Sequence, residues 1–222
     1  MTILVSVWGV APGAGKSTLC DGLCAALAEA GLRVDHFREA EILTRPEFDE
    51  VAEEFRGTGA VELRTLLKAA ARFADAIRAA ADDVVVADAL VPFVPTLLAM
   101  RHDERAIAAF TGELARILSD LGAVLIYLDG SAETALARAA EREGPQWLDA
   151  YVGKLARYEV LPPVRDLASA AAYLRRERAA TLAAARRMGW PVIRVETATE
   201  LSPGEVLAIA QHGLRPWVAQ LR

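Results

Sequence analysis

The residues best suited to chemistry lie in one short segment, in which glycines precede a lysine and two hydroxyl residues. The segment reads Gly9-Val10-Ala11-Pro12-Gly13-Ala14-Gly15-Lys16-Ser17-Thr18. Glycines let a backbone wrap closely, so that several N–H groups point at one phosphate, and a helix that starts there adds its positive dipole end. In this pattern Lys16 reaches the β- and γ-phosphates, Ser17 ligates Mg²⁺, and Thr18 packs against or touches the α-phosphate.

The segment departs from the full phosphate-loop (P-loop) pattern at one position. The pattern requires a glycine five residues before Gly15, where this chain has Val10, and Gly9 lies one residue too early. Either the loop is one residue longer, or Val10 tolerates the turn. The part from Gly13 to Thr18 is intact, and we predict that it binds the phosphates of ATP together with Pro12.

Two further candidates are carboxylates that follow predicted strands. Asp88 ends the apolar run Val84-Val85-Val86-Ala87, and a carboxylate there can hold Mg²⁺ through water. Glu39 follows a second strand, and ligands of open α/β sheets bind at the carboxyl ends of strands. We predict that Asp88 supports the metal and that Glu39 takes a proton from an acceptor hydroxyl, with Glu41 as the weaker alternative.

Two arginines on one predicted helix are candidates for a mobile lid. Arg138 and Arg142 are four residues apart and therefore share a helix face, and Gly144-Pro145 ends that helix. Guanidinium groups beside such a break suit phosphoryl transfer, so we predict a lid at about residues 138–146, with Glu143 as a candidate substrate ligand. A later arginine cluster between residues 175 and 187 is interpreted mostly as solvated surface.

The elements that position these residues alternate between strand and helix. We expect strands at 2–8, 32–38, 84–88, 123–128 and 191–195, and helices at 16–30, 60–81, 103–121, 131–142, 147–159, 164–188 and 203–212. This alternation predicts an α/β fold with a five-stranded parallel sheet and helices on both faces. With the phosphate loop, it predicts a P-loop NTPase fold in a single domain over residues 1–222.

The motifs together resemble the deoxynucleoside kinase and thymidylate kinase group of P-loop phosphotransferases. Residues 151–159, Tyr-Val-Gly-Lys-Leu-Ala-Arg-Tyr-Glu, look like the helix that follows the lid in deoxynucleoside kinases, and residues 138–143 look like that lid. The resemblance implies that Glu39 is the general base. It also implies that Arg72, in a helix similar to that of thymidylate kinases, grips the acceptor.

Two departures from the family pattern bear on the acceptor. No proline follows Glu39, and Asp88-Ala89-Leu90 lacks the arginine that the family carries after its third strand. These departures concern the acceptor more than the kinase chemistry. The resemblance implies an ATP- and Mg²⁺-dependent kinase that acts on a hydroxyl of a nucleoside-like small molecule. A nucleoside-monophosphate kinase and an antibiotic or sugar kinase are alternatives.

Composition restricts the remaining classes of function. The net charge of −5 argues against a nucleic-acid-binding protein, which usually needs a basic face. A regulatory P-loop NTPase is an alternative of another class, although no Asn-Lys-x-Asp motif indicates a GTPase. No apolar run is long enough for a membrane span and no secretory signal is recognisable, so we expect a cytoplasmic protein. The oligomeric state stays open, a homodimer included.

Overall fold

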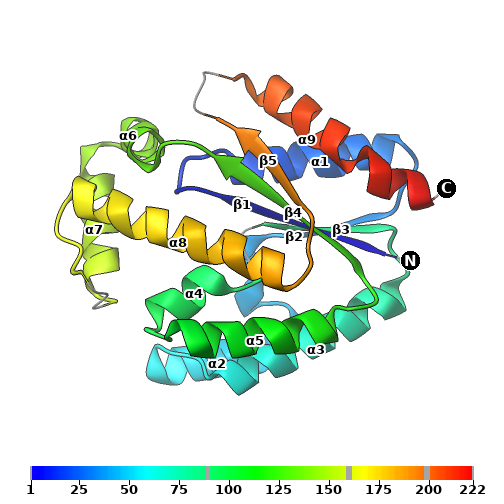
Figure 1. Ribbon diagram of the computed structural model, residues 1–222, viewed down its shortest axis with the longest axis horizontal. Helices are drawn as coiled ribbons and strands as arrows, with labels where there is room; N and C mark the ends of the chain where they lie inside the picture. Colours follow the sequence, from blue (N-terminus) through cyan, green and yellow to red (C-terminus); the bar gives the residue numbers. More distant parts are fainter. Residues whose placement is uncertain (1, 89–90, 159–161, 198–200, 222) are drawn as a thin grey trace.

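A computed structural model describes residues 2–88, 91–158, 162–197 and 201–221. Its centre is a five-stranded sheet in which all strands are parallel, in the order β2-β3-β1-β4-β5 (Figure 1). The strands are β1 (Ile3–Gly9), β2 (Val34–Phe37), β3 (Val84–Asp88), β4 (Gly122–Asp129) and β5 (Val192–Glu196). The predicted α/β class and the five strands are thereby confirmed.

Helices cover both faces of the sheet. On one face α1 (Lys16–Glu29) lies beside α9 (Pro203–Val218), and on the other α3 (Leu63–Ala80), α5 (Glu104–Ile117) and α8 (Leu167–Arg187) pack together (Figure 1). Successive residues of β1 point to opposite faces, so Leu4 and Trp8 join the core under α3 and α5, whereas Val5 and Val7 join the core under α1 and α9. The sheet therefore separates two apolar cores.

The remaining elements connect these layers. They are α2 (Asp49–Thr58), α4 (Val94–Ala99), α6 (Ala132–Glu143), α7 (Pro145–Ala156) and short 3₁₀ turns at Glu39–Leu43, Pro46–Phe48 and Ala219–Leu221. The sequence prediction omitted α2 and α4. Six-residue α4 is too short to show a period, and the apolar face of α2 is narrow, with Val51 and Ala52 buried. Glu159, Ala89 and Leu90, which the sequence comparison used, lie outside the described residues.

An aromatic cluster fixes the segment after β2, which carries Glu39. The rings of Phe37, Phe48 and Phe73 lie with centroids 5.0 to 5.9 Å apart, and they join β2 and a 3₁₀ turn to α3. The Arg45 guanidinium lies 4.4 Å above the Phe37 ring and forms two hydrogen bonds to Asp35, of 2.7 and 2.8 Å. Residues 38–48 are thus held at both ends, against the core and against β2.

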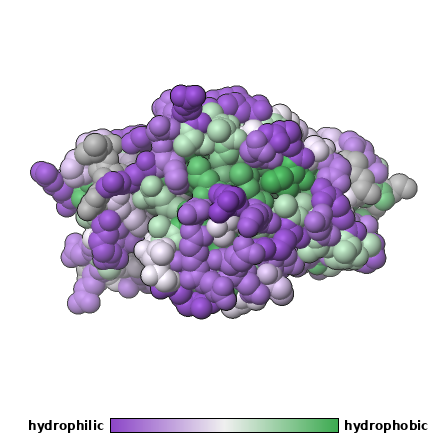
Figure 2. All heavy atoms as spheres, turned by 90° about the horizontal axis from the view of Figure 1, so that it is seen from below, coloured by the Kyte–Doolittle hydropathy of each residue, from purple (hydrophilic) through white to green (hydrophobic). Residues whose placement is uncertain are grey.

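The outer surface is mostly polar. Figure 2, which views the side on which α2, α3 and α5 lie in Figure 1, shows a largely hydrophilic face around a smaller apolar area. Within the described part of the chain, no helix is both long enough and apolar enough to cross a membrane.

We predict that Phe73→Ala destabilises the fold by about 3–5 kcal/mol, because it removes a fully packed ring from the aromatic cluster. Phe73 is 2% exposed, whereas Phe55 is 45% exposed, so Phe55→Ala is the matched control and should change stability by about 0.5 kcal/mol or less. Urea unfolding followed by circular dichroism measures both variants. Equal effects would show that the cluster does not hold this region together.

Candidate functional site

The glycine-rich loop joins the end of β1 to the start of α1. Gly13 and Gly15 have φ angles of 82° and 90°, a left-handed conformation that side chains other than hydrogen disfavour. A Cβ on Gly9 would lie 3.0 Å from the Ala14 Cβ, because the backbone of the loop folds closely over itself. The space beside Gly15 is open, with no atom within 4 Å of a Cβ placed there. The loop therefore has tight turns and one open face at the N-terminus of α1.

Val10 fits the loop without any glycine-like backbone. Its N–H donates to the Leu128 carbonyl at 3.0 Å, so it continues the pairing of β1 with β4, and its φ is negative. Its side chain is buried with Ala11 against Ala132 and Leu136 of α6. Of the two explanations left open by the sequence, the structure favours the one in which Val10 tolerates the turn.

Ser17 and Asp88 meet beneath the loop. The Ser17 Oγ donates to Oδ2 of Asp88 at 2.7 Å, although the two residues are 71 positions apart. The contact arises because β3 pairs with β1 in a register that places Asp88 beside Val7. Asp88 is buried, and its second oxygen, Oδ1, has no hydrogen-bond partner. A hydroxyl and a buried carboxylate with a free oxygen are donors that suit Mg²⁺.

No group of three or more His, Cys, Asp or Glu side chains that could hold a metal occurs among the described residues. A metal bound at Ser17 and Asp88 would therefore need ligands from another molecule. Phosphate oxygens and water are the usual source, because Mg²⁺ keeps several waters and takes few protein ligands.

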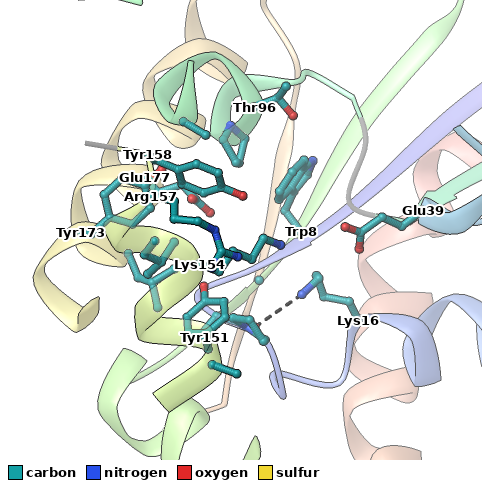
Figure 3. A pocket seen from close by; sticks show the side chains of 18 of the residues that line it. Trp8, Lys16, Glu39, Thr96, Tyr151, Lys154, Arg157, Tyr158, Tyr173 and Glu177 are labelled. Atoms are coloured by element: carbon teal, nitrogen blue, oxygen red, sulfur yellow. Dashed lines mark hydrogen bonds between the residues drawn. The ribbon is translucent and has the colours of Figure 1, made fainter. Parts of the chain in front are cut away.

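A cavity of about 630 Å³ opens beside the loop. Lys16 and Glu39 lie on one side of it, and Tyr158, Tyr173 and Glu177 on the side of α7 and α8 (Figure 3). Lys16 Nζ donates to the Ala11 carbonyl at 3.4 Å. The wall is rich in aromatic and charged side chains, namely Trp8, Lys16, Glu39, Trp147, Tyr151, Lys154, Arg157, Tyr158, Tyr173 and Glu177.

Glu39 and Glu41 differ in their surroundings. Glu41 accepts hydrogen bonds from the Arg45 Nε at 3.1 Å and from its own turn at the Arg38 N–H. Glu39 has no such partner among the described residues; it is exposed and lines both this cavity and a neighbouring one beside Ser17 and Asp88. Partial withdrawal from bulk water raises the pKa of Glu39, with Asp88 adding to the rise and Lys16 opposing it. Glu39 is therefore the carboxylate that is free to take a proton.

The predicted arginines lie in three different places. Arg138 lines a second cavity of about 170 Å³, together with Gly13, Ala14, Gly15 and Thr18, on the other side of the loop. Arg142 pairs with Glu143 at 2.8 Å, both are exposed, and neither lines the cavity beside Lys16. Arg72 donates to the Glu47 carbonyl at 3.0 Å and to Glu50 at 2.6 Å, so it ties α3 to α2 and also lies outside that cavity.

Sequence reasoning missed the far wall of the cavity. Lys154 and Arg157 of the α7 region and Glu177 of α8 all face it, and none was singled out. One signal was present: the chain has three lysines, Lys16, Lys68 and Lys154, and two of them line this cavity.

The arginines of α8 are mostly exposed, as expected, and Arg178 is the exception. Arg178 forms hydrogen bonds of 2.6 and 2.5 Å with both carboxylate oxygens of Asp129, at the end of β4. Burial alone would raise the pKa of Asp129, but hydrogen bonds from Arg178 and Arg194 outweigh it and lower the pKa. Arg175 pairs with Glu133 of α6. These ion pairs tie α8 to the sheet and to α6.

No protein-family model matches the chain, and a search of curated proteins finds no significant similarity.

We predict that Gly13→Ala destabilises the protein more than Gly15→Ala. A Cβ on Gly13 would lie 2.8 Å from the Ala135 carbonyl and 2.9 Å from the Ala139 Cβ, so overpacking adds to the strain of its positive φ. We expect about 2–5 kcal/mol for Gly13→Ala and about 1–2 kcal/mol for Gly15→Ala, where only the strain applies. Thermal and urea unfolding measure the difference. Equal losses would show that the loop does not pack tightly on α6.

Proposed function

We propose that the chain is a small-molecule kinase with a P-loop NTPase fold, which transfers the γ-phosphoryl group of ATP to a hydroxyl of a nucleoside-like acceptor. The observation that carries the proposal is the contact of Ser17 with Asp88 under a glycine-rich loop, beside a lysine that faces a separate cavity. One side of this arrangement suits a nucleotide and the other suits an acceptor.

The donor side is built from the loop and α1. Backbone N–H groups of residues 13–18 and the N-terminus of α1 would hold phosphate oxygens, and Lys16 would turn from the Ala11 carbonyl toward them. The cavity that Arg138 shares with Gly15 and Thr18 lies where the sugar or base of a nucleotide can extend. Ser17 and Asp88 would hold Mg²⁺, which when bound neutralises phosphate charge. The unpartnered Asp88 Oδ1 supports this fit.

The acceptor side is the larger cavity. Glu39 lines it next to Lys16, so it can take the proton of a hydroxyl that lies close to the phosphoryl group. Lys154 enters from α7 on the opposite side and adds a second cation (Figure 3). Transfer in such a site relies on positioning and charge neutralisation. A separate cavity at this place favours a kinase over a regulatory NTPase, which needs no acceptor pocket.

The predicted lid would belong to the same reaction. Residues 138–146 span the end of α6, Gly144 and the start of α7, and Gly144 has a φ of 97°. A movement there would bring Arg142 and Glu143, which now pair with each other, toward the loop. Such closure is common in phosphoryl-transfer enzymes.

We predict that Lys16→Ala abolishes phosphoryl transfer while the fold persists, because its side chain serves the nucleotide and not the core. The test is a coupled ATPase screen of nucleosides, nucleotides, sugars and amino sugars, with products identified by mass spectrometry. Lys68→Ala is the control, since Lys68 is exposed on α3. Transfer by Lys16→Ala at the rate of the unaltered protein would refute the proposed role of the loop.

We predict that Glu39→Gln lowers the transfer rate by about 10²–10⁴-fold and leaves ATP binding unchanged, because it removes the proton acceptor. Glu41→Gln should change the rate only mildly, since Glu41 binds Arg45. The raised pKa of Glu39 has a further consequence. As the pH falls, Glu39 loses its basic form at a higher pH than an ordinary glutamate does. The rate should therefore begin to fall at a pH above the ordinary glutamate range. Steady-state rates between pH 5 and pH 8 test both statements. The opposite ranking of the two variants would move the base to Glu41.

A further inference from the structure

The inner face of α8 directs one carboxylate into the large cavity. Tyr173, Leu174 and Glu177 are spaced by one and three residues, share a helix face and all line that cavity. Arg175 and Arg178 point elsewhere, to Glu133 and Asp129. Buried side chains such as Leu174 and Leu182 pack α8 against the core, and its ion pairs hold it to α6 and to the end of β4. In this orientation Glu177 faces the cavity.

Glu177 has no hydrogen-bond or ion-pair partner among the described residues. Burial raises its pKa to about 7, and the positive charges of Lys16 and Lys154 reduce this rise without cancelling it. Neither lysine comes within ion-pair distance of the carboxylate in the described structure. A carboxylate in this position requires a hydrogen-bond donor or a cation. The space in front of it is the cavity, so a ligand in the cavity can supply that partner.

We propose that Glu177 is the residue that selects the acceptor, by pairing with a basic nitrogen on an alcohol whose hydroxyl lies toward Lys16 and Glu39. The acceptor class is thus an amine-bearing alcohol with a flat or apolar middle part. The inference deepens the proposed function, because the ligand is a phosphoryl acceptor only if the protein is a kinase. The binding of an ammonium group at Glu177 does not depend on that function.

The walls of the cavity fit this chemistry. Trp8, Tyr151, Tyr158 and Tyr173 line it, and aromatic faces attract organic cations. The ring of Tyr151 is stacked on that of Trp147, with centroids 5.1 Å apart and planes inclined by 4°, so this wall presents a flat apolar surface. Aromatic rings combined with one unpaired carboxylate form a common chemical solution for binding an ammonium group.

The basic residues of the cavity form no ion pair with Glu177 among the described residues, although Lys16 and Lys154 act on it at longer range. Lys16 belongs to the loop, and phosphates bound to it would take up the charge that now compensates Glu177. Arg157 also lines a neighbouring cavity beside Phe55 and Gly59, so it lies at a boundary between the two. Lys154 is exposed and faces the loop side (Figure 3). The carboxylate of Glu177 therefore has the least compensating positive charge when ATP fills the nucleotide site, and a cationic ligand then binds it most favourably.

The pH dependence of ligand binding can reflect any titratable group that lines the cavity. From the loop, the turn after β2, the α7 region and α8, they are Lys16, Glu39, Lys154, Arg157, Tyr151, Tyr158, Tyr173 and Glu177. Burial raises the pKa of both Tyr151 and Tyr173, so these phenols stay neutral at pH 6–8. Titration near neutral pH is thus expected from Glu177, with Glu39 titrating at its own raised pKa.

The experiment uses three small probes of matched shape: 4-(aminomethyl)benzyl alcohol, 4-methylbenzyl alcohol and 4-(hydroxymethyl)benzoic acid. Their binding is measured by calorimetry and by the fluorescence of Trp8 and Trp147, with and without a non-hydrolysable ATP analogue and Mg²⁺. We expect the ammonium probe to bind about tenfold or more tightly than the neutral one. Between pH 8 and pH 6 this advantage should fall by about tenfold, because Glu177 becomes protonated.

Glu177→Gln should remove both the preference and its pH dependence. Glu141→Gln is the matched control, since Glu141 is exposed on α6. If Glu177→Gln does not fold, the three probes and the pH series on the unaltered protein still test whether the cavity prefers an ammonium group. Tighter binding of the carboxylate probe, an absent preference for the ammonium probe, or a preference that persists in Glu177→Gln overturns the inference.

The two proposals fail separately. Probe binding that depends on Glu177, together with no phosphoryl transfer to any compound, would refute the kinase and retain the ammonium site. Transfer to neutral or anionic acceptors that is insensitive to Glu177→Gln would retain the kinase and refute the ammonium site.

Discussion

The pairing of β3 with β1 is the constraint on which the rest of the site depends. It brings Asp88 to the end of a strand next to the glycine-rich loop, where its carboxylate is buried and accepts a hydrogen bond from Ser17. A buried carboxylate with one unpartnered oxygen is unfavourable in an apolar core. A buried carboxylate at the carboxyl end of an inner strand is explained if the site holds a cation. For this reason the metal and the nucleotide are proposed together.

An ion-pair network lies at the corresponding end of β4. Asp129 ends β4, as Asp88 ends β3, but it is saturated by Arg178 and Arg194. Two carboxylates in equivalent positions therefore have different uses. The one with two guanidinium partners anchors α8, and the one with only a hydroxyl partner stays available for a ligand.

Charge in the large cavity is divided by position. The lysines reach toward the loop, Glu39 lies beside Lys16, and Glu177 lies at the wall formed by α8 (Figure 3). A ligand that bridges the cavity would meet a cationic end and a carboxylate end, separated by aromatic rings. This polarity gives the proposed acceptor a direction: its hydroxyl lies at the loop and its nitrogen at α8.

Local sequence determined the elements of this protein, and long-range packing decided the partners of its charged residues. The glycine-rich loop, the apolar strands and the long helices could be predicted because backbone conformation and burial periodicity depend on neighbouring residues. Asp88, Glu39 and Lys16 could be placed at one end of the sheet for the same reason, since parallel strands end together. Arg72, Arg142 and Glu177 could not be assigned from sequence: each lies on an amphipathic helix, and whether it meets an ion-pair partner or a cavity depends on elements remote in the chain. Arg178 and Arg175 of α8 meet Asp129 and Glu133, which are more than 40 residues away, and so only the tertiary structure reveals which charges of α8 face the site.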